Sequence, residues 1–181
     1  MKSALLIVDV QNDYFEDGAN PLVHSLETLL NIKKLLEHFR GHNDTVIFIR
    51  HLATSPSATF FKPDTLGSEI HSALDVLPEE KVVVKHFPNS FRDTELHQIL
   101  QKQGISDLVI CGMMSHMCID ATTRAAKDLG FTCTVIDDAC TTKDLEIYGI
   151  TIKANDVHLS FMAALNYFYS QVISTEQFLK Q

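Results

Sequence analysis

Short apolar runs of strand length alternate with helical patterns along most of this 181-residue chain. The runs are Ala4–Val8, Thr45–Ile49, Lys81–Val84, Asp107–Cys111 and Phe131–Ile136. Between the first two, apolar residues recur at positions 22, 26, 29, 32, 35, 36 and 39, which is a helical period. This alternation predicts an α/β fold, a three-layer sandwich whose mostly parallel central sheet carries helices on both faces. The chain has no repeats and no internal break that would suggest two domains, so we expect a single domain over residues 1–181.

The remaining segments fill in this pattern. We expect helices from Asp93 or Thr94 to Gln103, over Met117–Leu129 and over Val157–Tyr169, and a short last helix capped by Ser174 or Thr175. Residues 51–68 hold two prolines and no clear period, which indicates a surface loop. Residues 141–156 break the rhythm and predict a small hairpin of Leu145–Tyr148 with Thr151–Lys153. Such an excursion either covers a neighbour or a pocket, or is a plain surface loop.

Charge and hydropathy exclude several classes of function. The formal net charge is -8 and no basic tract occurs, which argues against a nucleic-acid partner. No apolar run approaches the roughly 18 residues of a bilayer span, and MKSALLIV is too short for a signal peptide. We therefore expect a cytoplasmic protein without a membrane partner. The four cysteines form no C-x-x-C pair, so free thiols are expected instead of a zinc ribbon.

Three chemically active side chains follow the ends of apolar runs: Asp9, Lys85 and Cys118. Parallel strands present their carboxyl ends at one edge of a sheet, which is where ligands bind in open α/β folds. A carboxylate, an ammonium and a thiol at this edge would form a nucleophile with its base and its counter-charge. The simpler interpretations are a turn aspartate, a solvated lysine and a small buried cysteine.

The segment before Cys118 strengthens the first interpretation. A strand, a tight turn and a helix start follow one another here, and Ser115 is a good N-cap whose hydroxyl could accept from the Cys118 N–H. A thiol at a helix N-terminus has a lowered pKa, which favours thiolate. Ser115 itself is a weaker nucleophile candidate, because no histidine–carboxylate pair is evident to activate it.

Three motifs around these residues resemble those of a known family. LLIVDVQNDYF is similar to its opening strand, VVVKHFPNSFRDTEL to its lysine strand with N-S-F in place of the usual S-A-F, and ICGMMSHMCIDATTRAA to its nucleophile motif G-V-x-T-x-x-C-V. Over almost its whole length the chain resembles the isochorismatase-like cysteine hydrolases, which include nicotinamidases and N-carbamoylsarcosine amidases. The resemblance implies a catalytic triad of Asp9, Lys85 and Cys118.

The resemblance also implies a reaction. Cys118 would attack a carbonyl carbon of a small amide, ureide or carbamoyl substrate, with Asp9 as general base and acid and Lys85 stabilising the thiolate. An acyl-thioester would form, and water would complete the hydrolysis. The oxyanion would be held by the backbone N–H groups of Met114 and Cys118, next to a cis peptide at Met113–Met114.

Departures from the family pattern bear on cofactors and substrate. Nicotinamidases carry a metal site of an aspartate and histidines after the second strand, whereas here that stretch has His51 without a paired carboxylate. We therefore expect no metal and no other cofactor, and we consider nicotinamide a poor candidate substrate. Isochorismatases proper lack the nucleophilic cysteine, so Cys118 argues against that activity.

Further residues are candidates for binding the small-molecule substrate, each with ordinary core or surface packing as the alternative. They are Gln11, Tyr14, Phe15, Phe91 and His116. His86 and His158 also lie near predicted cleft elements, where lone histidines are commonly structural.

Two other functional classes stay open. One is a non-catalytic domain that binds a small ligand or partner through the same cleft, and the other is a redox-sensing thiol with Cys111 as the nearest resolving cysteine in sequence. Family members are commonly dimers or larger, and the 141–156 excursion and the apolar Val157–Tyr169 helix offer surface. We therefore expect a homo-oligomer.

Overall fold

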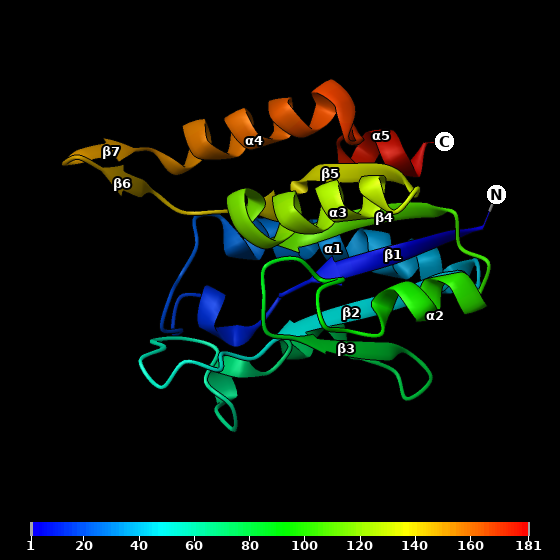
Figure 1. The fold of residues 1–181 in the computed structure, drawn as a ribbon, viewed down its shortest axis with the longest axis horizontal. Helices are drawn as coiled ribbons and strands as arrows, with labels where there is room; N and C mark the ends of the chain where they lie inside the picture. The colour runs from blue at the N-terminus through cyan, green and yellow to red at the C-terminus, as the bar shows by residue number, and fades with distance from the viewer. Residues whose placement is uncertain (1, 181) are drawn as a thin grey trace.

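A six-stranded sheet lies at the centre of the computed structural model, which describes residues 2–180 (Figure 1). All its neighbouring strands are parallel, in the order β3-β2-β1-β4-β5-β8. The strands are β1 Ser3–Val8, β2 Thr45–His51, β3 Lys81–Lys85, β4 Asp107–Met113, β5 Thr132–Thr141 and β8 Gln171–Ile173. The predicted parallel sheet is confirmed, with β8 as an additional edge strand.

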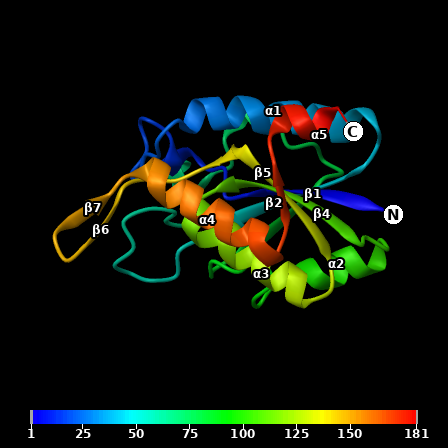
Figure 2. The ribbon, with the colours of Figure 1, turned by 90° about the horizontal axis from the view of Figure 1, so that it is seen from above.

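Helices cover both faces of this sheet, so the predicted three-layer sandwich is also confirmed. They are α1 Ser25–Gly41, α2 Leu96–Lys102, α3 Asp120–Asp128, α4 Ala154–Phe168 and α5 Thr175–Leu179. Figure 2 shows α1 and α5 on one side of the sheet and α2, α3 and α4 on the other. Successive β1 residues point to opposite faces, so Leu5 and Ile7 join one apolar cluster while Ala4 and Leu6 join the other. Within residues 2–180, no helix has the length and apolar character needed to cross a membrane.

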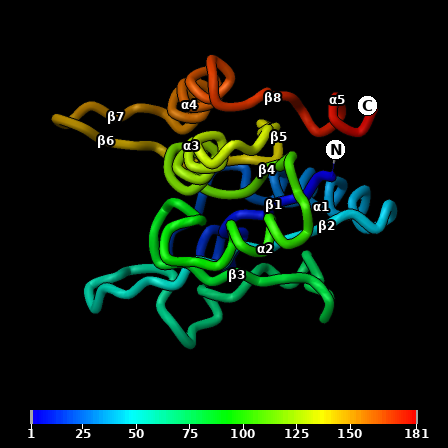
Figure 3. The backbone as a smooth tube through the Cα atoms, turned by 45° about the vertical axis from the view of Figure 1, so that its right-hand side comes forward, coloured from blue at the N-terminus to red at the C-terminus, as the bar shows by residue number. Residues whose placement is uncertain are grey.

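Two excursions leave the body at the carboxyl end of the strands. The hairpin of β6 Leu145–Ile147 and β7 Ile150–Ile152 is antiparallel and projects outward, as predicted (Figures 1 and 3). The other is the long connection between β2 and β3, which includes the short 3₁₀ turns Leu66–Ser68 and Ser72–Leu74. The buried Asp13 carboxylate fastens this connection, because its Oδ2 accepts the Phe61 N–H at 2.6 Å.

The predicted helix Met117–Leu129 is wrong at its start. A π-helical turn, Ser115–Ile119, comes first and runs directly into α3. Ser115 does not act as an N-cap, because its hydroxyl is hydrogen-bonded to His158 Nδ1 at 2.8 Å. The Ser115 hydroxyl, which the sequence predicted as a helix cap, is therefore bonded to a residue of α4 instead. Short π-helical turns are frequent at functional sites.

Candidate active site

Parallel pairing brings the ends of β1, β3 and β4 to one edge of the sheet. Asp9 follows β1 directly, in a left-handed conformation with φ 53°, and its N–H donates to the Ile49 carbonyl at 3.0 Å. Lys85 is the last residue of β3 and lies opposite His51 at the end of β2. Asp9 and Lys85 therefore lie at the same edge of the sheet, on strands that are separated by β2.

Lys85 is the centre of the site. Its Nζ lies 2.7 Å from Asp9 Oδ2 and donates to Cys118 Sγ at 3.1 Å. Asp9 and Lys85 are fully buried, and Cys118 is only 5% exposed. The carboxylate, the ammonium and the thiol thus converge as the sequence predicted, and Lys85 is not a solvated edge charge.

Two further acceptors surround the same ammonium. Lys85 Nζ donates to the Phe87 carbonyl at 3.1 Å and lies 3.0 Å from His51 Nδ1. Neither contact was predicted from the sequence. The signal for His51 was present, because His51 ends β2 just as Lys85 ends β3, but that strand was predicted to stop at Ile49.

Burial dominates the ionisation of the thiol. It raises the pKa of Cys118, the Asp9 charge raises this pKa further, and the Lys85 ammonium opposes them without prevailing. The expected lowering of the thiol pKa is therefore wrong for the resting site, because desolvation outweighs the helix terminus and the nearby cation. Burial thus favours the thiol form of Cys118, so any reaction at its sulfur would require removal of this proton. Asp9 Oδ1, which has no hydrogen-bond partner among the described residues, is available for this proton.

The ionisation of Lys85 and His51 is consistent with a neutral Cys118 thiol. Burial alone would lower the pKa of Lys85, but the charge of Asp9 and the hydrogen bonds to Asp9 and Cys118 outweigh it and the pKa is raised. His51 has its pKa lowered from 6.5 to about 4, first by burial and then by the Lys85 charge. At neutral pH the site therefore holds an ammonium next to a neutral imidazole.

The turn that carries Cys118 depends on Gly112. A Cβ at Gly112 would lie 2.1 Å from the Val8 carbonyl oxygen, and its φ of +124° is unfavourable for other residues. Only glycine lets β4 pass this close to β1 before the chain turns. The Met113–Met114 peptide, one residue further along, is cis, as the family resemblance implied.

The predicted binding residues separate into two groups. Tyr14 is 1% exposed, packs edge-on against Phe61 at 4.6 Å, and has its pKa raised first by burial and then by Cys118 and Asp9, so it lies near the site. The Gln11 side chain is also buried beside the site. Its amide holds backbone groups, donating to the carbonyls of His51 and Ser68 and accepting the His51 N–H.

The other predicted residues have partners outside the triad. The Phe15 ring packs on His71 at 4.2 Å, and the Phe91 ring stacks with Phe131 at 6.0 Å. The His116 ring is hydrogen-bonded through Nδ1 to Thr142 Oγ1 at 2.5 Å. Substrate contact by these three side chains stays a prediction.

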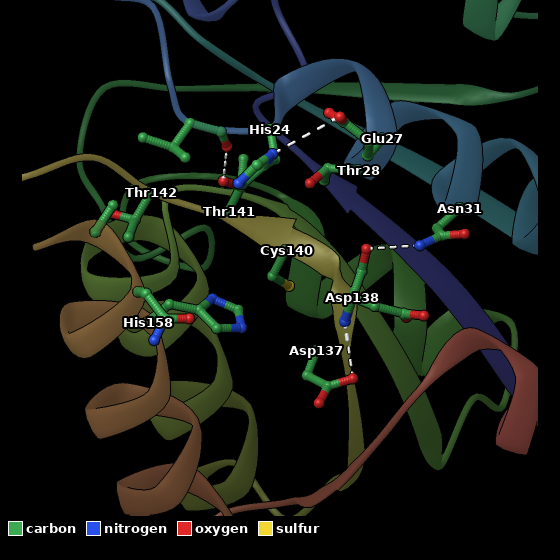
Figure 4. A pocket seen from close by; sticks show the side chains of 13 residues that line it. His24, Glu27, Thr28, Asn31, Asp137, Asp138, Cys140, Thr141, Thr142 and His158 are labelled. Atoms are coloured by element: carbon green, nitrogen blue, oxygen red, sulfur yellow. Dashed lines mark hydrogen bonds and ion pairs between the residues drawn. The ribbon is translucent and has the colours of Figure 1, made fainter.

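A cavity of about 300 Å³ lies between α1, the outer part of β5 and the start of α4 (Figure 4). Its wall includes Cys140, Thr142 and His158 but none of Asp9, Lys85 or Cys118. Two of its wall residues are hydrogen-bonded to the turn that carries Cys118, His158 to Ser115 and Thr142 to His116.

One group of residues has the donor atoms for a metal ion. Donor atoms of Asp9, His51 and Cys118 all lie within 4.8 Å of one another. However, Lys85 Nζ contacts all three at 2.7 to 3.1 Å. The ammonium thus occupies the point where a cation would bind, and this donor set does not fit a metal while Lys85 is in place.

Comparison with known proteins agrees with the fold. A family model described as the isochorismatase domain matches residues 3–177, so the chain belongs to the isochorismatase family. The Bacillus subtilis isochorismatase family protein YddQ is 48% identical over 180 residues, covering 99% of this chain and 100% of that protein. An isochorismatase-type protein from Oleispira antarctica has a crystal structure with a TM-score of 0.95 and 45% identity, covering 99% of this chain and 97% of that one.

A relative with a stated activity is more distant. A streptothricin hydrolase of Streptomyces noursei is 34% identical over 142 residues, which are 78% of this chain and 50% of that enzyme. This chain therefore spans about half of its length.

Proposed function

We propose that this chain is a cysteine hydrolase that cleaves the C–N bond of a small amide, ureide or carbamoyl compound through an acyl-thioester on Cys118. One observation carries the proposal: the buried Lys85 ammonium lies 2.7 Å from the Asp9 carboxylate and 3.1 Å from the Cys118 sulfur. A buried carboxylate, ammonium and thiol at the carboxyl edge of a parallel sheet are costly to fold, and such groups cluster at functional sites.

In the first half-reaction, Asp9 takes the proton from Cys118 and the sulfur attacks the substrate carbonyl carbon. Lys85 stabilises the thiolate that forms on the way. The carbonyl oxygen becomes an oxyanion held by the N–H groups of Met114 and Cys118. Asp9 then gives its proton to the substrate nitrogen, the C–N bond breaks, and ammonia or an amine leaves.

In the second half-reaction, water attacks the thioester carbonyl while Asp9 takes one of its protons. The C–S bond breaks, the acid is released, and the proton returns from Asp9 to the sulfur. Asp9 thus acts twice as base and twice as acid, which requires a carboxylate with one oxygen free of other partners. Asp9 Oδ1 meets this requirement within the described residues.

The substrate class rests on family membership and on the size of the site. The relative from Streptomyces noursei is a streptothricin hydrolase, which supports hydrolysis as the reaction type. Because Cys118 is only 5% exposed, we propose that a small substrate reaches it. We further propose that no metal takes part, since the ammonium of Lys85 already supplies the cation.

The test is to incubate the protein with a panel of primary amides, ureides and carbamoyl compounds and to measure ammonia release. We expect turnover of at least one compound, lost in Cys118→Ala and insensitive to chelators. Cys133→Ala is the matched control, because Cys133 is also a buried free cysteine but lies on β5. Release that survives Cys118→Ala would overturn the proposal, and binding without release would favour a non-catalytic domain.

A further inference from the structure

The Lys85 ammonium has more acceptors than hydrogens. An ammonium carries three N–H donors and no acceptor, whereas Asp9, Cys118, Phe87 and His51 each place an acceptor atom within 3.1 Å of it. One of the four is therefore in excess while the site is at rest. A buried N–H without an acceptor costs about 1–3 kcal/mol, so a spare acceptor matters if another is lost during the reaction.

In the hydrogen bond between Lys85 and His51, only Lys85 can be the donor. Because Lys85 can only donate, His51 Nδ1 must be the unprotonated ring nitrogen, and the ring proton lies on Nε2. The low pKa of His51, about 4, agrees with a neutral ring. The groups that set this pKa are the buried surroundings, Lys85, Asp9 and His86.

The backbone of His51 is held independently of the ammonium. Its backbone N–H donates to Gln11 Oε1 at 2.8 Å, and its carbonyl accepts from Gln11 Nε2 at 2.9 Å. It also lies opposite Lys85 in the β2–β3 register. Gln11 thus anchors the His51 backbone from the β1 side without any contribution from the Lys85 ammonium.

In the proposed reaction, the number of acceptors around Lys85 changes. When Cys118 is acylated, its sulfur carries a carbonyl group and becomes a poor acceptor. We propose that His51 is a positioning residue, whose Nδ1 takes up the Lys85 N–H that Cys118 releases and so keeps the ammonium fully hydrogen-bonded beside Asp9 during thioester hydrolysis. The catalytic part of this inference rests on the proposed function, whereas the exchange of acceptors does not.

Removing Cys118 and His51 singly and together tests the exchange without a substrate. Cys118→Ala and His51→Leu each leave three acceptors for the three hydrogens, whereas the double variant leaves two. We expect the loss in the urea unfolding midpoint of the double variant to exceed the sum of the two single losses. Additive losses would overturn the inference.

Two matched series control for packing. Asparagine places its amide oxygen near the position of Nδ1, so His51→Asn combined with Cys118→Ala should give additive losses. Glutamine reaches toward Nε2 instead, so His51→Gln should behave like His51→Leu and serves if the leucine variant does not fold.

His86 is exposed and hydrogen-bonded to Leu52, so His86→Leu with Cys118→Ala should be additive. Excess loss in the asparagine or His86 series would overturn the inference.

A kinetic readout separates positioning from structure. With a substrate from the ammonia panel, His51→Leu should slow thioester hydrolysis and accumulate acylated Cys118 in intact-protein mass spectra, while His51→Asn should not. Accumulation in neither variant would contradict the catalytic part. If the panel yields no substrate, the proposed function fails while the unfolding experiment still decides the acceptor exchange, so the two failures are distinguishable.

Discussion

At the scale of single residues, Asp9 and Lys85 act on Cys118 in opposite directions. The Asp9 charge raises the thiol pKa, and the Lys85 charge lowers it. Asp9→Asn should therefore move the appearance of the Cys118 thiolate to lower pH, although we expect the variant to lose turnover because the proposed base is gone. Lys85→Met should move it to higher pH.

Ultraviolet thiolate absorbance during a pH titration measures this directly, with the Cys118→Ala protein subtracted to remove the other cysteines. Shifts of the same sign in the two variants would contradict the charge assignment. A lower activity of Asp9→Asn alone does not distinguish a base from a structural residue, whereas more thiolate with less turnover identifies the base.

A second prediction at this scale concerns how His51 makes the stability of the protein depend on pH. Its pKa is about 4 in the folded protein, below its usual 6.5, so the unfolded chain binds a proton between these values that the folded protein does not. Stability contributed by His51 is thus present above pH 6.5 and is lost as the pH falls toward about 4. Urea midpoints should fall more steeply over this range in the natural protein than in His51→Asn, and equal slopes would contradict the buried neutral imidazole.

At the scale of elements, the close approach of β4 to β1 should make Gly112 irreplaceable. A Cβ there would meet the Val8 carbonyl oxygen at 2.1 Å, whereas one at Gly130, also at positive φ, would meet nothing within 4 Å. Gly130→Ala should cost about 1–2 kcal/mol from its backbone conformation. Gly112→Ala should lower the unfolding free energy by at least about 3 kcal/mol or prevent folding. Chemical denaturation of both variants checks this. Equal losses of unfolding free energy in the two variants would contradict the prediction and show that β4 can move away from β1 at little cost.

Much of this element pattern could be predicted from the sequence, because strand-length apolar runs and helical periods are local signals. Strand β8, Gln171–Ile173, gave no such signal, since three residues at a sheet edge are ordered mainly by pairing with β5. The π-helical turn could not be predicted either. Its first residue, Ser115, is hydrogen-bonded to His158 of α4, which is a contact between residues far apart in the chain.

At the scale of the whole molecule, the projecting β6–β7 hairpin exposes large apolar side chains. Ile147, Tyr148 and Ile150 on it are 52%, 94% and 64% exposed, and an isolated two-stranded hairpin is marginally stable in water. We propose that a second copy of this chain covers it. Tyr148→Ser with Ile150→Ser should shift sedimentation toward monomer, whereas Leu66→Ser, at an 84% exposed site away from the hairpin, should not. A natural protein that is monomeric at all concentrations would contradict this.

The convergence of the triad was predictable because parallel strands must end at one edge, so Asp9, Lys85 and Cys118 could be grouped from their places alone. Burial and partner choice could not be predicted in this way. The raised Cys118 pKa, the engagement of Gln11 with backbone groups and the contact of His51 with Lys85 all depend on packing from other elements.

The central claim is that the three converging groups perform covalent chemistry at the sulfur. Peptide mass spectrometry after rapid acid quenching, with a compound that releases ammonia, tests it most directly. We expect an acyl group on Cys118 during turnover, absent from Cys118→Ala. Turnover with unmodified Cys118 at every quench time, or an acyl group on another residue, would contradict it.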